Sequence, residues 1–181
     1  PANVLIDETV RIITDGRQSF DNGGNLALQG KVDEKWLDEI ISRDAYLLKK
    51  PPKSTGREYY TKEFAMDLYR QGIKRGLDNL SILATITAYT AKSIKNQIDE
   101  FVLDKIKIDE LYVSGGGAHN QMIMKLLSEY VEADVKNVES LEFSGDAKEA
   151  IAFAILGNEF LCGKTNNIPN STGASKRVIM G

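Results

Sequence analysis

The chain has 181 residues, of which 42% are hydrophobic and 27% are charged, so it is long and apolar enough to bury a core. Its 23 basic and 26 acidic side chains give a net charge of −3, which lacks the basic excess usual for nucleic-acid-binding proteins. A single cysteine and a single histidine exclude an internal disulfide and a zinc site of the usual kind, and no apolar stretch is long enough to cross a membrane. A reducing, cytoplasmic setting fits these counts best.

Helices are expected throughout the first hundred residues. Apolar side chains recur at helical spacing in the segments 4–13, 34–43, 61–75 and 79–103. The first of these could also be a strand, since its apolar residues are nearly continuous. Asp33 is expected to cap the second helix. A loop is predicted at 14–25, which is rich in Gly, Asp and Asn, and an extended connector at 44–59, which contains two prolines.

The pattern changes after residue 109. Short apolar runs at 110–113 and 134–138 indicate buried strands, and helices are expected over about 120–131 and from 144–150 onward. Alternation of strand and helix predicts a βαβ unit with a parallel strand pair.

A glycine triplet, 115–117, joins the first predicted strand to a helix in LYVSGGGAHNQMIMKLL. Glycines let the backbone approach a ligand closely, and a helix start presents free N–H groups and a positive dipole end to an anion. The spacing is not that of the dinucleotide motif GxGxxG, because the third glycine is misplaced. A nucleotide-binding turn and a tight turn without a ligand are equally compatible with these residues. His119 is interpreted as a polar loop residue rather than a base.

A second glycine motif, GNEFLCGKT at 157–165, resembles a phosphate-binding P-loop but fails on spacing. Five residues separate Gly157 from Gly163, whereas the P-loop has four, and a helix rather than a strand precedes the motif. A glycine that ends the preceding helix is the favoured interpretation.

Three charged side chains are further candidates for a site. Asp7 lies among apolar neighbours in VLIDETV, and it either faces solvent on an amphipathic helix, as the local pattern favours, or points into a site. Glu149 in SGDAKEA either belongs to a helix cap formed by Ser144 or Asp146, again the favoured interpretation, or faces a cleft. Arg57 in KSTGRE could contact an anion, although an ordinary surface loop explains it equally well.

Taken together, these segments resemble the anhydro-N-acetylmuramic acid kinases. The resemblance extends over nearly the whole chain, in family order, through PANVLIDETV, QGKV, PKSTGREYY, LYVSGGGAHNQMIMKLL, SGDAKEAIAFAIL and NIPNSTGASKRVIMG. PKSTGREY, GDAKEAIAFA and the PxxTGA tail are specific to this family. The glycine triplet alone is shared with the wider superfamily of sugar kinases, hexokinases, actin and Hsp70-like proteins.

The resemblance implies an α/β fold: a helix-rich, ribonuclease-H-like (actin-like ATPase) lobe with a small mixed sheet. Residues 1–181 would form the C-terminal lobe of a two-lobed kinase. The start at Pro1, directly before an apolar segment, suggests a chain cut from something longer, with the N-terminal lobe missing. A nucleotide-binding or regulatory lobe of the same superfamily without kinase chemistry, and an interaction surface that forms a homodimer, are the alternatives.

The resemblance also implies a reaction. Family members open the 1,6-anhydro ring of anhydro-N-acetylmuramic acid with water and phosphorylate O6 from ATP with Mg²⁺, which recycles peptidoglycan fragments in bacteria. Asp7 matches the catalytic base and Glu149 a sugar-contacting carboxylate, and Arg57 falls in a family-typical segment as a substrate-binding candidate. The cofactor-binding candidates are Asn3 on the phosphate side and Gly115, Gly116, Gly117 and Asn120 around adenosine. Phosphoryl transfer depends on positioning and electrostatics, so the isolated chain is expected to be inactive or nearly so.

Overall fold

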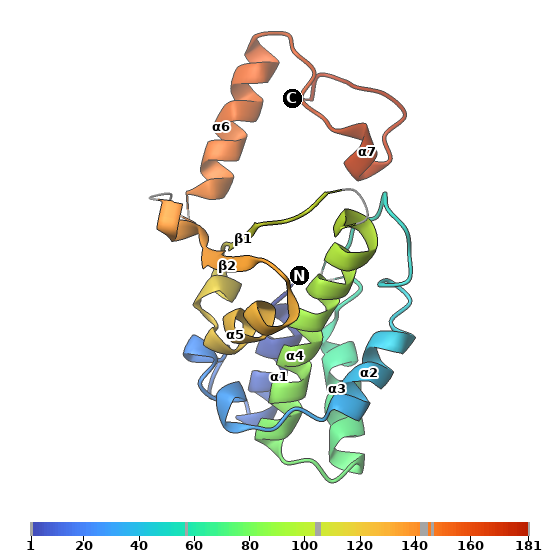
Figure 1. Cartoon of the computed structure of the whole chain (residues 1–181), viewed down its shortest axis with the longest axis vertical. Helices are drawn as coiled ribbons and strands as arrows, with labels where there is room; N and C mark the ends of the chain where they lie inside the picture. Colours follow the sequence, from blue (N-terminus) through green and yellow to red (C-terminus); the bar gives the residue numbers. More distant parts are fainter. Residues whose placement is uncertain (1, 57, 104–105, 142–144, 146, 181) are drawn as a thin grey trace.

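The computed structural model describes residues 2–56, 58–103, 106–141, 145 and 147–180 (Figure 1). Its helices are α1 (Val4–Ile13), α2 (Glu34–Arg43), α3 (Lys62–Lys74), α4 (Asn79–Ile98), α5 (Gln121–Tyr130), α6 (Lys148–Leu161) and α7 (Pro169–Thr172). Its strands are β1 (Glu110–Val113) and β2 (Asp134–Asn137). The helix-rich α/β class predicted from the sequence is confirmed. None of the helices in the described ranges is both long and apolar enough to span a membrane.

Side-chain caps fix where several helices begin. The carboxylate of Asp33 accepts a hydrogen bond from the Trp36 backbone N–H at 2.9 Å, which confirms Asp33 as the cap of α2. The carboxylate of Asp78 likewise accepts a hydrogen bond from the Ser81 backbone N–H at the start of α4. Each bond satisfies one of the backbone donors that a helix start leaves without a partner.

Helix α4 is the centre of the helical body. Every residue from Ser81 to Ala91 is buried, and α1, α2, α3 and α5 all pack against this helix. A Cβ atom on Gly72 of α3 would lie 2.5 Å from Ile82 Cγ1 and 3.1 Å from the Trp36 ring, so glycine permits this close packing. The helix predicted over 79–103 differs at its end: α4 stops at Ile98, and Asp99–Leu103 forms a wider π-helical turn with no buried residue. Apolar spacing does not distinguish these two kinds of turn.

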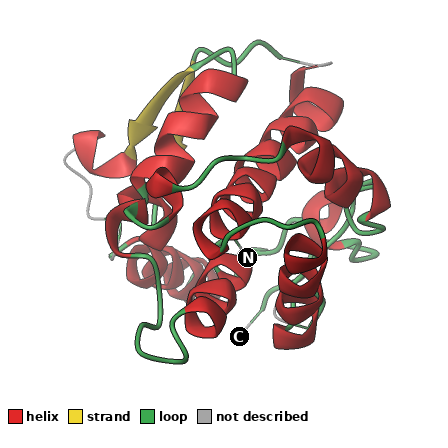
Figure 2. Cartoon of the chain, turned by 90° about the horizontal axis from the view of Figure 1, so that it is seen from below, coloured by secondary structure: helices red, strands yellow, loops and turns green. Residues whose placement is uncertain are grey.

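The two strands form a parallel pair, with Glu110 opposite Asp134 and Val113 opposite Asn137. Helix α5 connects them, so the predicted βαβ unit is confirmed. The expected mixed sheet is wrong for the described residues, where the sheet has only these two parallel strands. A helical crossover returns the chain in the same direction, and an antiparallel neighbour would need a further strand. Figure 2 shows the strands at the edge of the helical body.

Helix α6 extends beyond the strands, away from the helical body (Figure 1). The end of α7 lies beside the connector before α3, where a Cβ on Gly173 would lie 3.4 Å from Pro52 Cγ. None of the residues of α6 is buried; Phe153 is 73% exposed and Leu161 84%. Helix α6 ends at Leu161 with Cys162 as its C-cap, and Gly163 follows with a φ of +66°, so the expected glycine at its end is confirmed.

Candidate functional site

A cavity of about 310 Å³, which we call the glycine-turn cavity, lies where α1, the loop 19–23 and the turn before α5 meet. Four residues that the sequence had singled out line it: Asn3, Asp7, Gly116 and Asn120. The other lining residues are Ile6, Arg11, Ser19, Phe20, Asp21, Asn22, Gly23 and His119. Residues more than one hundred positions apart therefore converge on one space.

Asp7 lies in the first turn of α1, where its backbone N–H donates to the Asn3 carbonyl at 2.8 Å. The apolar face of α1 is buried, and Asp7 and Arg11, four residues apart, share another face. The local pattern favoured solvent for Asp7, but the residue is half-buried and lines a cavity. The difference arises because the distant segments 19–23 and 60–62 border this face of the helix.

A smaller cavity of about 190 Å³ shares Asp7 and Arg11 with the first. Its far side is formed by Tyr60, Thr61 and Lys62, which continue the KSTGRE segment. The Arg11 guanidinium donates to the Glu8 carboxylate at 2.5 Å. Sequence reasoning missed Arg11, although its spacing of four from Asp7 is a signal that the two share a helix face.

The glycine turn brings the start of α1 close to the start of α5. Gly115 has a φ of +76°, and a Cβ added to Gly116 would lie 2.9 Å from Asn3 Nδ2. Gly117 is also near Asn3, with 3.6 Å between its Cβ position and Oδ1. The Oδ1 atom of Asn3 is buried and has no hydrogen-bond partner within the part of the chain that the structure describes. An acceptor left in this state is costly, and a ligand donor would satisfy it.

Asn120 has a structural role in the same place. It is 6% exposed, and its Oδ1 accepts a hydrogen bond from the Ile123 N–H at 3.1 Å, which caps α5. His119 also lines the cavity, with its Nε2 4.0 Å from the Glu139 carboxylate; both side chains are largely exposed. The interpretation of His119 as a polar residue of the turn agrees with this position.

Glu149 is not brought to the glycine-turn cavity. Glu149 is exposed in the first turn of α6 and is absent from the cavity lining. The N-cap position of α6 is Ala147, which makes no side-chain capping bond, and the cap candidates Ser144 and Asp146 lie outside the described residues. Arg57 also lies outside them. The substrate roles of Glu149 and Arg57 stay predictions.

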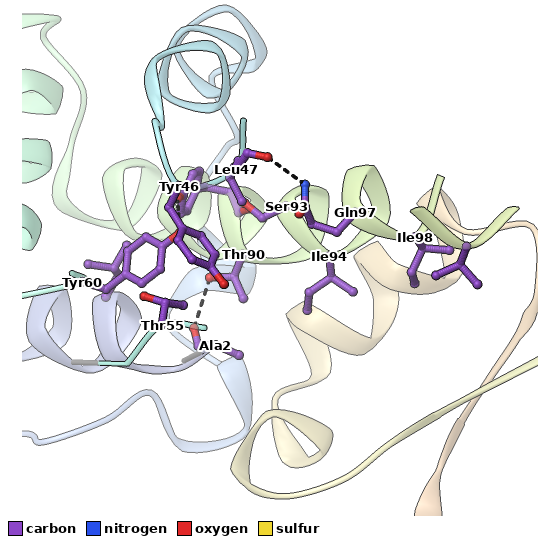
Figure 3. Close-up of a pocket in the computed structure, with 13 residues that line it drawn as sticks. Ala2, Tyr46, Leu47, Thr55, Tyr60, Thr90, Ser93, Ile94, Gln97 and Ile98 are labelled. Carbon is purple, nitrogen blue, oxygen red and sulfur yellow. Dashed lines mark hydrogen bonds between the residues drawn. The ribbon is translucent and has the colours of Figure 1, made fainter. Parts of the chain in front are cut away.

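A larger and more apolar cavity, about 430 Å³, lies between α4, the segment 46–60 and the start of α1 (Figure 3). Behind it, the buried Asp44 carboxylate accepts hydrogen bonds from the Tyr59 and Tyr60 hydroxyls, each at 3.0 Å, and from the Tyr89 hydroxyl. Burial, together with the nearby Asp44 charge, raises the pKa of Tyr60 and of Tyr89 well above the ordinary tyrosine range. Among the described residues, none of the predicted site residues lines this cavity, so we do not assign it as the active site.

The described residues contain no group of three or more His, Cys, Asp or Glu side chains that could hold a metal ion. In the glycine-turn cavity, the Asp21 carboxylate is already engaged, because its two oxygens accept the Leu26 and Ala27 N–H groups at 2.9 Å each. A divalent cation here would therefore need ligands beyond the described residues.

Comparison with known proteins gives a consistent result. The family model for anhydro-N-acetylmuramic acid kinase matches residues 1–181. The chain is 39% identical to the enzymes of that name from Caldanaerobacter subterraneus subsp. tengcongensis and Francisella tularensis subsp. novicida, and 36% identical to that from Clostridioides difficile. Each match includes 100% of this chain but only 46% of the relative, so the chain spans less than half the length of these proteins.

Proposed function

Because the chain belongs to the anhydro-N-acetylmuramic acid kinase family, we propose that it is part of an enzyme that converts anhydro-N-acetylmuramic acid, water and ATP into N-acetylmuramic acid 6-phosphate and ADP. One observation carries the proposal: Asp7, Asn3, Gly116 and Asn120, which were assigned to catalysis and nucleotide binding, line one cavity. The proposal includes a cytoplasmic location and a place in the recycling of peptidoglycan fragments.

In the proposed reaction, Asp7 is the general base. Its carboxylate takes a proton from the water that attacks C1 of the sugar, the C1–O6 bond breaks, and O6 bonds to the γ-phosphorus as ADP leaves. The position of Asp7 supports this role, because the residue is half-buried and lines the same cavity as Asn3 and the glycine turn. A positioned base contributes about 10²–10⁴-fold to such a step.

The glycine turn and Asn3 would bind the nucleotide. Gly115 to Gly117 would let the backbone approach the adenosine, and the buried Oδ1 of Asn3, without a partner, leaves an acceptor for a ligand hydrogen-bond donor. In this proposal the βαβ unit belongs to a ribonuclease-H-like core. Mg²⁺ would accompany the ATP phosphates, which supply most of its ligands in such sites, and no described residue is assigned to it.

The sugar site would be completed by other parts of the protein. We propose that residues 1–181 form the C-terminal lobe and that an N-terminal lobe supplies the remaining phosphate and sugar contacts. Two findings support the presence of a further lobe: the relatives are about twice as long, and α6 leaves its apolar side chains exposed. Within residues 1–181, Glu149 and Arg57 would contact the sugar.

The test is an assay of the full-length protein that contains this chain, with ATP and anhydro-N-acetylmuramic acid as substrates. We expect ADP release together with a product phosphorylated at O6, observed by phosphorus NMR. ATP binding without any phosphorylated sugar would refute the kinase proposal and favour a nucleotide-binding or regulatory lobe. The isolated 181-residue chain is expected to show no turnover, and a rate near that of the full-length protein would refute the lobe assignment.

A further inference from the structure

Phe20 is the one phenyl side chain among the described residues that line the glycine-turn cavity, whose other lining residues, apart from Ile6, are polar, charged or glycine. It is 56% exposed, whereas most of its neighbours in the lining are polar or glycine, among them Asp7, Asn22 and Asn120. Neither the sequence patterns nor the family resemblance assigned it a role. An exposed phenyl ring gains stability when a flat, weakly hydrated surface covers it.

The loop that carries Phe20 is anchored directly after it. Asp21 is 6% exposed, and its carboxylate accepts hydrogen bonds from the Leu26 and Ala27 N–H groups, both at 2.9 Å. Ala27 is itself fully buried in the core. The backbone at Phe20 is therefore tied to a fixed part of the fold, which reduces the entropy that its ring would lose on binding a ligand.

The same loop is pressed against the start of α5. Gly24 has a φ of +75°, and a Cβ atom there would lie 2.3 Å from Asn120 Oδ1 and 3.0 Å from the Met122 nitrogen. Asn120 directly follows the glycine turn, so this contact sets the distance between the Phe20 loop and that turn. Both segments line the one cavity, with Gly116 and His119 on the side of the turn.

We propose that Phe20 is a nucleotide-binding residue, whose ring packs against the purine base of ATP. This inference rests on the proposed function, in which the glycine turn binds adenosine. The base would lie between the Phe20 ring and the glycine turn. The close approach of Gly24 to Asn120 fixes the distance between the Phe20 loop and this turn. The sugar would lie nearer Asp7 and Arg11. These two residues also line the smaller cavity, together with Tyr60 and Lys62.

The test compares Phe20→Ala, Phe20→Leu and Phe20→Tyr in the full-length protein. Loss of a base-stacking ring typically weakens binding about tenfold, so Phe20→Ala is expected to raise the KM for ATP by roughly that factor, with the KM for the sugar unchanged. Phe20→Leu keeps most of the volume but no aromatic face and is expected to show a smaller rise, and Phe20→Tyr none. Leu48→Ala, an exposed apolar position absent from the linings of the cavities described above, is the control that should change nothing.

Inorganic tripolyphosphate, which has no base, separates stacking from a general disturbance of the cavity. Its inhibition constant is expected to be the same for the wild type and for Phe20→Ala. Three results for Phe20→Ala would each overturn the assignment and leave the kinase proposal intact. They are an unchanged KM for ATP, a rise only in the KM for the sugar, and a loss of tripolyphosphate affinity equal to the loss of ATP affinity. If the wild type does not phosphorylate the sugar, the proposed function fails, and calorimetric titration of ATP into both proteins still decides the role of Phe20.

Discussion

The side-chain amide nitrogen of Asn3 lies 2.9 Å from the position that a Cβ atom on Gly116 would occupy. This contact joins the helix that carries Asp7 to the turn that precedes α5, so the catalytic and nucleotide-binding candidates share one boundary. Asn3 and Asp7 are also connected through the backbone, because the Asp7 N–H donates to the Asn3 carbonyl. A disturbance of the turn is therefore expected to reach the start of α1.

Gly116→Ala tests this boundary. The added methyl group would meet Asn3, which must shift by several tenths of an ångström, so we expect a higher KM for ATP and a lower kcat in the full-length protein. Gly157→Ala is the matched control, because a Cβ there meets nothing within 4 Å and an alanine suits the interior of α6. Equal kinetics for Gly116→Ala and the wild type would show that the contact is not required.

Asp7→Asn separates chemistry from binding. The amide cannot take a proton from the attacking water, so kcat is expected to fall by about 10²–10⁴-fold while the dissociation constant for ATP stays the same. Glu129→Gln, an exposed carboxylate of α5, is the control for the loss of one negative charge. Retained turnover in Asp7→Asn would disprove the base assignment.

Asp44 is expected to be a major determinant of stability. Asp44→Ala would leave the hydroxyls of Tyr60 and Tyr89 buried without their acceptor, and we expect a loss of about 3–5 kcal/mol in the free energy of unfolding. Tyr89→Phe removes one donor and keeps the ring, so its loss should be about 1–2 kcal/mol. Denaturant titration of the isolated chain measures both. A loss below that of Tyr89→Phe would contradict the role of Asp44.

The same tyrosines predict a loss of stability at alkaline pH. Their pKa values are raised in the folded chain by burial and by Asp44, so the unfolded chain releases these protons first. Stability is therefore full below the ordinary tyrosine pKa of about 10 and falls as the pH rises above it. Tyr89→Phe should make this fall less steep, as measured by unfolding between pH 8 and pH 11, roughly two units below to one unit above that ordinary pKa. If the free energy of unfolding falls equally steeply with pH in the wild type and in Tyr89→Phe, Tyr89 does not contribute to the alkaline loss of stability.

The exposed face of α6 gives a prediction about assembly. Phe153→Ser and Leu161→Ser should reduce self-association of the isolated chain in sedimentation experiments, because both side chains are largely exposed there. In the full-length protein, the same substitutions should lower stability if another lobe covers this helix. Amide exchange in α6 that is equally fast in the isolated chain and in the full-length protein would argue against that covering.

Local chemistry predicted most of the fold. Asp33 and the apolar spacing after it are sufficient to place α2, and the short runs at 110–113 and 134–138 gave both strands. The cavity could not be predicted in this way, because it depends on contacts between distant segments. The approach of Gly24 to Asn120 joins residues nearly one hundred positions apart, and nothing in the loop 14–25 indicates that partner. Phe20 was for this reason assigned only to a loop.

The deep burial of Trp36 against Gly72 makes the chain's single indole a natural optical probe. An indole in an apolar core emits at shorter wavelength than one in water, so intrinsic fluorescence will follow the unfolding of the helical body alone. Far-ultraviolet circular dichroism will also register α6, which lies outside that core. If the two signals report different melting temperatures, α6 is a separate cooperative unit in the isolated chain. A single shared transition in the full-length protein would then show that the rest of the protein couples α6 to the helical body.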